Sequence, residues 1–245
     1  MADARATAAS TTSRLFQAMP PPDSQAVLGA GAHRSLRKGQ VLMRQGEPAS
    51  AFFLMERGYL KLTQLTPEGA EVIVRFVGPG DPVAGVAALG EAPYPVSATA
   101  CDEVNVLAWS RGQLAELLAR YPQLKTNILR EMTAHMDDAL TRLRELATLD
   151  VRQRLAHTLL RLTQPVKAAA GAAGLTVPHT LTRQELAELT GTTLFTVSRI
   201  LTEWEGAGLV HSTRAHVAVL DAERLQDAAD GSSRSGAATA GSWTR

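Results

Sequence analysis

The stretch TRQELAELTGTTLFTVSRIL, residues 182–201, predicts two short helices that meet at one glycine. Thr182 followed by Glu185 is the pattern of a capping box, because the Thr hydroxyl accepts from an early backbone N–H while the Glu side chain reaches back. Gly191 is suited to end the first helix, since glycine tolerates the left-handed conformation that follows many helices. Thr193 is expected to cap the second helix.

The second helix is expected to have an apolar face and a polar face. The apolar residues that share one face at helical spacing are Val197, Ile200, Leu201 and Trp204. Phe195, Ser198 and Arg199 share another face at spacing i, i+3 and i+4. A helix-turn-helix has this division, with one side docked on its first helix and the other offered to the major groove of DNA. The alternative interpretation is a helical hairpin that binds nothing.

The segment LVHSTRAHVAVL, residues 209–220, predicts a two-stranded wing after these helices. Arg214 lies near its tip and is a candidate phosphate contact. The other residues expected to contact phosphates are Arg183, Thr192, Thr193 and Thr196. Their alternative role is helix capping.

Short β-prone runs fill the region from Leu36 to Trp109. The runs are QVLMR, AFFLM, YLKLTQL, EVIVRFV and VNVLAW, and the glycines among them are Gly39, Gly46, Gly58, Gly69 and Gly80. Turn glycines at such intervals are typical of an antiparallel roll or barrel.

A long helical pattern follows from about Gln113 to Leu149, with one break near Tyr121 and Pro122. Its apolar residues alternate spacings of three and four, the a/d rhythm of a two-stranded coiled coil. They are Leu129, Met132, Met136, Ala139, Leu143 and Leu146. We expect a homodimer interface here, because so narrow a stripe covers little area for an ordinary core face. The alternative is a helix packed on its own domain.

Composition limits the classes of function. The net charge of +1 over 245 residues means that any nucleic-acid-binding surface must be local. The single Cys101 excludes an internal disulfide framework and a multi-cysteine metal site within one chain. No catalytic triad, paired carboxylates or phosphate loop is apparent, so an enzyme is not expected. Without a signal-peptide core or a membrane-length apolar run, a soluble cytoplasmic protein is expected.

Taken in order, these features resemble the Crp/Fnr superfamily of bacterial transcription regulators from about His33 to Leu220. KGQVLMRQGEPASAFFLMERGYLKLTQLTPEGAEVIVRFVGPGD, residues 38–81, resembles the effector-domain pattern of that superfamily, and residues 182–201 resemble its DNA-binding signature. The wording of the latter is closest to the nitric-oxide-responsive branch. The resemblance implies an α+β fold with a jelly-roll type β-roll like that of cyclic-nucleotide-binding domains, a long dimerisation helix and a winged helix-turn-helix.

The domain boundaries expected on this basis follow the changes in composition. Disordered tails are expected over residues 1–25, which are rich in Ala, Ser, Thr and Pro, and over 226–245, which are rich in Ala, Ser and Gly. An effector-sensing roll is expected over 26–120, a dimerisation helix and hinge over 121–150, and a DNA-binding domain over 151–225. The expected partners are double-stranded DNA, a second copy of the chain, and RNA polymerase if the protein is an activator.

The effector is not expected to be cyclic AMP. In family members that bind it, a Glu and an Arg after the "GD" pair hold the ribose and the cyclic phosphate, but here Gly85 and Tyr94 or Pro95 fall at those positions. No Lys or Arg occurs from Phe76 to Ser110. A buried phosphate without a cationic partner faces a desolvation cost of several kcal/mol. We assign Gly85, Val86 and Tyr94 to the effector pocket.

Other sensing chemistries of the family are tested in the same way. The N-terminal cysteine cluster that holds an iron–sulfur cluster is missing, so that cofactor is not expected. The carbon-monoxide-sensing haem member has Cys and His where this chain has Ala84 and Val86. Haem remains as a candidate cofactor through the nitric-oxide-responsive branch, with His33 or His135 as axial ligand. A surface turn for His33 and the rim of the dimer helix for His135 are the alternatives.

The resemblance also assigns base contacts to the second helix. Arg199 matches an Arg that approaches guanine, where a bidentate contact contributes about 1–3 kcal/mol of discrimination. Ser198 matches a small polar residue near a thymine methyl or base edge. Phe195 replaces a Glu that accepts from cytosine, and an aromatic ring can instead lie against a thymine methyl. The competing function is a ligand-sensing roll whose C-terminal helices hold a protein partner rather than DNA.

Overall fold

The computed structural model describes residues 13–85, 90, 92–165, 175–176, 181–213 and 216–231. The chain divides into two compact units, Met1–Arg144 and Glu145–Arg245. The elements of the first unit are η1 (Arg14–Phe16), α2 (Pro21–Gly29), β1 (Ala32–Leu36), β2 (Val41–Met43), β3 (Ala51–Arg57), β4 (Leu60–Leu65), β5 (Glu71–Val77), β6 (Pro82–Val83), β7 (Ser97–Ala100), β8 (Val104–Ser110), α4 (Arg111–Arg120) and most of α5 (Pro122–Thr148).

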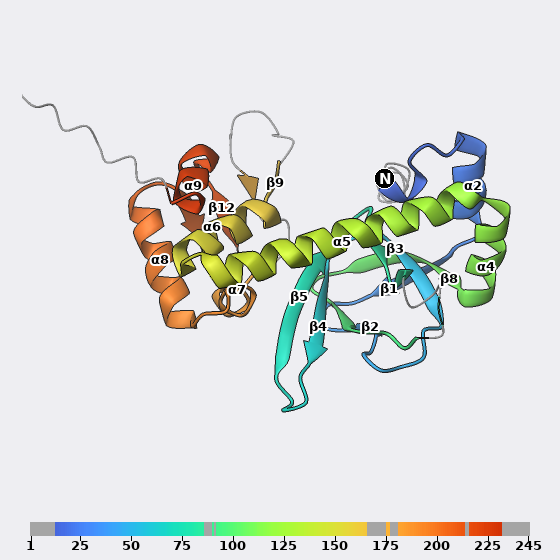
Figure 1. The fold of residues 1–245 in the computed structure, drawn as a ribbon, viewed down its shortest axis with the longest axis horizontal. Helices are drawn as coiled ribbons and strands as arrows, with labels where there is room; N and C mark the ends of the chain where they lie inside the picture. Colours follow the sequence, from blue (N-terminus) through green and yellow to red (C-terminus); the bar gives the residue numbers. More distant parts are fainter. Residues whose placement is uncertain are drawn as a thin grey trace, which may run out of the picture. The chain divides into compact units, whose positions relative to one another are not determined.

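The elements of the second unit follow the last turn of α5. They are α6 (Val151–Leu162), β9 (Gln164–Pro165), β10 (Leu175–Thr176), α7 (Arg183–Thr190), α8 (Leu194–Gly206), β11 (Val210–Ser212), β12 (Val217–Val219) and α9 (Ala222–Ala229). Figure 1 shows both sets of elements along the chain. No helix in the described part of the chain is long and apolar enough to span a membrane.

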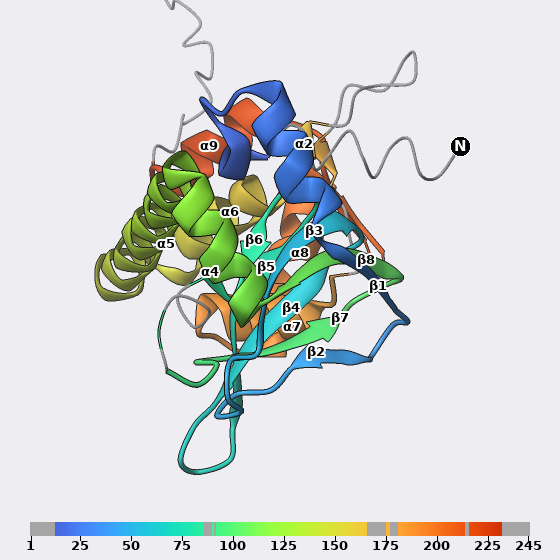
Figure 2. The ribbon, with the colours of Figure 1, turned by 90° about the vertical axis from the view of Figure 1, so that its right-hand side faces the viewer.

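Two antiparallel sheets form the N-terminal roll, in the orders β1-β8-β3-β6 and β2-β7-β4-β5. Figure 2 shows the strands with α2 and α4 beside them. The predicted antiparallel roll is therefore confirmed, and its five β-prone runs correspond to β2, β3, β4, β5 and β8. The strands β1 and β6 and the helix α2 were not predicted.

Strand β3 connects the two cores of this unit because both of its faces are buried. Phe53 and Met55 point into the interior of the roll, while Phe52 and Leu54 alternate onto the outer face. The outer face is covered by helical residues, among them Leu114 of α4 and Leu124 and Ile128 of α5. The roll thus has one core between its sheets and a second core beneath its helices.

The described parts of the two predicted tails, residues 13–25 and 226–231, are ordered structure, which corrects the predicted disorder at these positions. Leu15 and Phe16 of η1 are buried against the helix-covered core, and Asn127 donates to the carbonyl oxygens of Leu15 and Gln17 at 2.9 and 2.8 Å. At the other end, Ala229 closes α9 in a buried position. Composition alone missed these contacts because a few apolar side chains are enough to fix a polar segment. Residues 1–12 and 232–245 lie outside the described residues.

Helix α5 places its residues on two faces. Leu124 and Ile128 are buried against the roll, and Met132 continues this inner face. Met132 therefore does not lie on the outer stripe to which the a/d spacing assigned it. The apolar residues that are about half exposed or more on this helix are Leu129, Met136, Leu140, Leu143 and Leu146, and Ala139 is also exposed.

The turn between β3 and β4 requires glycine at position 58 for two reasons. Its φ of +79° lies in the left-handed region, and a Cβ there would meet the Glu103 carbonyl oxygen and would lie 2.7 Å from Asp102 Oδ1. Asp102 Oδ1 accepts from the Tyr59 N–H at 2.8 Å, so a methyl group would displace a used acceptor. Gly39 has nearly the same φ, +81°, with nothing within 4 Å of such a Cβ.

Gly58→Ala is expected to lower the midpoint of urea unfolding of the N-terminal unit more than Gly39→Ala does. Gly39→Ala should cost about 1–2 kcal/mol for the left-handed conformation alone. The steric overlap should add about 1–3 kcal/mol at Gly58. Equal midpoints for the two variants would contradict the close packing of this turn.

Candidate nucleic-acid interface and effector cavity

The two helices begin after the predicted caps, and the first of them ends at the predicted glycine. Thr182 Oγ1 accepts from the Glu185 N–H at 3.1 Å, and Glu185 Oε2 accepts from the Thr182 N–H at 3.0 Å, which is a complete capping box. Gly191 follows α7 with φ +61° and ψ +47°. Thr193 caps α8, its Oγ1 accepting from the Thr196 N–H at 3.2 Å. The predicted capping of both helices is confirmed.

One face of α8 is buried and the other is open. Val197, Ile200, Leu201 and Trp204 are each at most 2% exposed, as the helical spacing predicted. On the opposite side Phe195 is 78% exposed and Arg199 is exposed, while Ser198 is half-buried. Helix α8 packs on α7 within the C-terminal unit. This arrangement is a helix-turn-helix with a free outer face.

Leu194 was missed in the sequence. It begins α8 next to Phe195 and is 47% exposed, so two apolar side chains stand side by side on the first turn of an exposed helix face. Helical spacing gave no signal for this, because at 100° per residue Leu194 falls beside Leu201 at the edge of the buried face.

Arg199 keeps its guanidinium available because its nearest acidic neighbour on α8 is already engaged. Glu203, one turn later, accepts two hydrogen bonds from Arg152 of α6, at 2.6 and 2.7 Å. This contact lowers the pKa of the Glu203 carboxyl and raises that of Arg152. Within the described part of the chain, the Arg199 side chain makes no ion pair or hydrogen bond. All N–H donors of the Arg199 guanidinium are therefore available to a ligand.

The expected phosphate contacts lie around this helix in different ways. Thr193 and Thr196 are joined by a hydroxyl contact of 3.0 Å, and the Thr192 N–H donates to the Ala187 carbonyl at 2.9 Å. Arg183 donates to Ser212 Oγ of β11 at 3.1 Å, which ties the start of α7 to the wing. The wing itself is confirmed by antiparallel pairing of β11 with β12. Arg214 lies outside the described residues.

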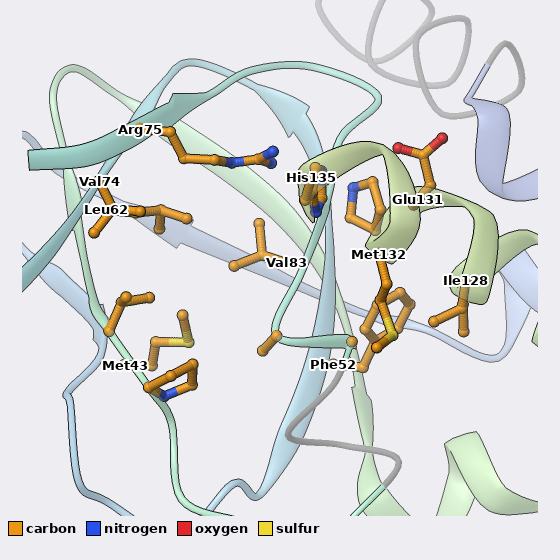
Figure 3. Close-up of a pocket in the computed structure, with 15 residues that line it drawn as sticks. Met43, Phe52, Leu62, Val74, Arg75, Val83, Ile128, Glu131, Met132 and His135 are labelled. Carbon is orange, nitrogen blue, oxygen red and sulfur yellow. The ribbon is translucent and has the colours of Figure 1, made fainter. Parts of the chain in front are cut away.

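The N-terminal unit contains a cavity of about 210 Å³ between the roll and α5. Most of its lining is apolar. Figure 3 shows three polar side chains along one edge of it, Arg75 from β5 and Glu131 and His135 from α5. Ala84, which also lines it, has a φ of +66°, a strained conformation for a residue with a Cβ. Strain of this kind clusters at ligand sites.

A cationic side chain, Arg75, does line this cavity and can pair with an anion. The sequence has no Lys or Arg from Phe76 to Ser110, but the cation at the cavity comes from the residue just before that range. Strand alternation from Val77 could have found it, because Arg75 and Val77 pair with Leu62 and Leu60, whose side chains lie in the core of the roll. That cyclic AMP does not bind stays a prediction. A missing cation no longer supports it, so it depends on the other residues that line the cavity.

Burial shapes the protonation of the other polar groups. It lowers the pKa of His135 to about 4, so the imidazole is neutral near pH 7, and the neighbouring Arg75 acts in the same direction. Burial also raises the pKa of the Glu131 carboxyl. The neutral imidazole keeps one N–H donor.

The residues assigned to the effector pocket are placed differently. Gly85 lines the cavity, whereas Val86 lies outside the described residues. Tyr94 does not line it. Its hydroxyl accepts from the N–H groups of Ser50 and Ala51 and donates to the Ala51 carbonyl, each at 3.1 Å, so it supports the roll from within the core.

The two histidines proposed as haem ligands lie in different surroundings. His33 Nδ1 contacts Glu56 Oε2 at 2.9 Å on an exposed part of β1, away from the cavity lining. His135 does line the cavity, but about 210 Å³ is below the roughly 300–1,000 Å³ of sites for drug-sized ligands. A macrocycle does not fit this space, so we derive no haem chemistry from it. The described residues contain no cluster of three or more His, Cys, Asp or Glu placed to hold a metal ion.

Each of the two units matches a known protein family. Residues 33–121 match the cyclic nucleotide-binding domain family, and residues 153–228 match the Crp-like helix-turn-helix domain family. The chain is 28% identical over 211 residues to the CRP-like cAMP-activated global transcriptional regulator of Mycobacterium tuberculosis, covering 86% of this chain and 94% of the relative. The solved catabolite activator protein of Thermus thermophilus is 26% identical, with a TM-score of 0.52 over 90% of this chain and 100% of that chain.

The similarity to a further relative shows which family the chain belongs to. Transcriptional activator protein anr of Pseudomonas aeruginosa is 30% identical over 192 residues, which cover 78% of each chain. With the roll, the helix-turn-helix and the two matched domains, this similarity confirms the resemblance found in the sequence. The chain belongs to the Crp/Fnr superfamily of transcription regulators.

Proposed function

We propose that the protein is a homodimer that binds a palindromic operator through α8 and responds to an effector held in the N-terminal roll. The observation that carries this proposal is the outer face of α8, where Phe195 and Arg199 are exposed on a helix whose other face is buried. Arg199 reads a guanine in each half-site through bidentate hydrogen bonds. Thr192, Thr193, Thr196 and Arg183 set the position of the helix on the phosphates.

The homodimer is supported by the outer stripe of α5. Leu129, Met136, Leu140 and Leu143 are separated by seven, four and three residues, which is a heptad rhythm. Leu140 takes the place that the sequence assigned to Ala139, because the inner face is set by the contact with the roll. Exposed leucines in such a row are costly in water and are covered when two copies pair.

Effector control works through the choice between dimer geometries. In the active geometry the two copies of α8 are about one turn of DNA apart, roughly 34 Å. The last turn of α5 is fastened to the C-terminal unit, since Arg161 contacts Glu145 at 2.6 Å and Arg154 donates to the Leu149 carbonyl at 2.6 Å. These contacts join the two sides of Asp150, which caps α6, so movement at the hinge expected there has to break them. An activator would also contact RNA polymerase.

The second candidate function is a ligand-sensing roll whose C-terminal helices hold a protein partner. The exposed Leu194 and Phe195 favour it, because an apolar pair is also suited to a protein surface. Selection of bound sequences from a random DNA pool separates the two functions. Enrichment of a palindrome supports the regulator, whereas retention without sequence preference supports the partner module.

Arg199→Ala is expected to abolish selective binding to the selected operator while leaving salt-dependent binding to unrelated DNA nearly unchanged. The loss should be about tenfold or more per half-site, from the roughly 1–3 kcal/mol of a bidentate guanine contact. Arg199→Lys keeps the charge but not the fork and should lose selectivity as well. Competition gel shifts measure both affinities, and an equal loss on both kinds of DNA would contradict the assignment.

Phe195 is expected to read a thymine methyl group. Replacing that thymine by uracil should weaken binding about fourfold per half-site, because one buried methyl contributes about 0.8 kcal/mol. In Phe195→Ala the same uracil operator should bind as well as the thymine operator. Uracil at thymines outside the half-sites is the control. Sensitivity to uracil that persists in Phe195→Ala would assign the methyl to another residue, with Leu194 next to be tested.

Leu143→Asp is expected to yield monomers that bind the palindrome poorly, because a carboxylate would be buried in the paired stripe. Light scattering measures the mass in solution. Leu143→Met keeps an apolar side chain of similar volume and should remain dimeric. A stable Leu143→Asp dimer would count against this interface.

A further inference from the structure

The cavity beneath α5 is lined by the cationic side chain of Arg75, which lies within electrostatic reach of the carboxylates of Asp81, Asp138 and Glu131. The Arg75 guanidinium lines the cavity and makes no hydrogen bond or ion pair within the described ranges of the chain. Its burial lowers the pKa of Arg75, a sign that the charged form is poorly solvated there. A poorly solvated charge without a direct hydrogen-bonding partner is costly, and an anionic ligand would reduce that cost further than these carboxylates do.

The polar groups gather at one edge and leave the rest of the cavity apolar. Figure 3 shows Arg75 extending from β5 towards α5, where Glu131 and His135 lie. The described residues that complete the lining are Met43, Phe52, Leu62, Val74, Pro82, Val83, Ala84, Gly85, Pro95, Val96, Ile128 and Met132. None of these twelve side chains has a hydrogen-bonding N–H or O–H group.

We propose that this cavity binds a small carboxylic acid with an apolar body, its carboxylate paired with Arg75 and its hydrocarbon or aromatic part among Phe52, Val83 and Met132. The proposal rests on the proposed function, because it names the effector class of the same roll. The Arg75 fork matches a carboxylate bidentately. The neutral His135 imidazole adds an N–H donor at the same edge.

Size and lining favour this class over a cyclic nucleotide. At about 30 Å³ per water, a cavity of about 210 Å³ has the volume of roughly seven water molecules. That suits one or two rings or a medium-length acyl chain. A ribose and a purine would bring hydroxyl and ring nitrogen groups against the apolar part of the lining, where the described residues offer them no side-chain partner.

Such a ligand would also contact the helix that carries the outer stripe. Ile128, Met132 and His135 lie on α5 and line the cavity, and Met132 is about one turn from Met136 and two turns from Leu140. A bound acid thus changes the packing of the same helix whose opposite face pairs with the second copy. A ligand that fits one position of α5 better than another shifts the dimer geometry accordingly.

Calorimetry on the full-length protein tests the proposal without DNA. The probes are octanoate and 2-naphthoate, each compared with its neutral amide, octanamide or 2-naphthamide, which has nearly the same shape. We expect at least one acid to bind with a Kd below about 1 mM and its amide to bind about tenfold more weakly or worse. Binding of neither acid, or equal binding of acid and amide, would overturn the proposal.

Two variants assign the anion contact. Arg75→Met keeps the length of the side chain and should remove the preference of acid over amide, whereas Arg44→Met, at an exposed position next to the lining residue Met43, should keep it. Should Arg75→Met fail to fold, Arg75→Lys should still bind the acid more weakly than the wild type. An unchanged preference in Arg75→Met, or in Arg75→Lys where only that variant folds, would overturn the assignment.

Two further measurements complete the test, binding of cyclic AMP as a competing anion and binding of the protein to DNA. Cyclic AMP that binds more tightly than both acids and is lost in Arg75→Met would overturn the proposal in favour of a cyclic phosphate site. Operator selection is measured separately on the same protein. Acid binding without sequence-selective DNA retention would refute the proposed function and leave the cavity chemistry supported, and the reverse result would refute the cavity chemistry alone.

Discussion

The burial of one face of α8 is the constraint on which the function of the C-terminal unit depends. Val197, Ile200, Leu201 and Trp204 are removed from water, and the 3.6-residue period then fixes which side chains stand outside. Phe195 and Arg199 are exposed as a consequence of that burial. The Arg152–Glu203 pair completes the arrangement, because it engages the carboxylate that would otherwise compete for Arg199.

Helix α5 differs from α8 because it has apolar residues on two faces, and each face needs its own packing partner. Its inner face, with Leu124 and Ile128, is committed to the roll, and Met132 follows them. Its outer face retains leucines and a methionine at heptad spacing. One rigid helix with two apolar faces is a simple physical link between a cavity in the roll and the pairing of two copies.

The cavity and the reading face use arginine in different ways. Arg199 is exposed, and its fork is kept open by neighbouring contacts, so it is available to a base edge. Arg75 lies against an apolar cavity, where its charge is poorly solvated and favours an anion. A relative described as cAMP-activated is similar to this chain in sequence, but the ligand of this chain depends on the side chains that line its own cavity.

The sequence by itself determined the helix-turn-helix and the roll, because capping pairs such as Thr182 with Glu185, the turn glycines and the apolar face of α8 are local patterns with one physical reading. Only the tertiary structure decided that Met132 faces inward, that Leu15 and Phe16 are buried, and that Arg75 lines a cavity. These three depend on which surfaces meet across long sequence separations, since Leu15 meets α5 more than a hundred residues later. Periodicity says that a helix or strand has two faces, and only the packing of the whole chain says what each face meets.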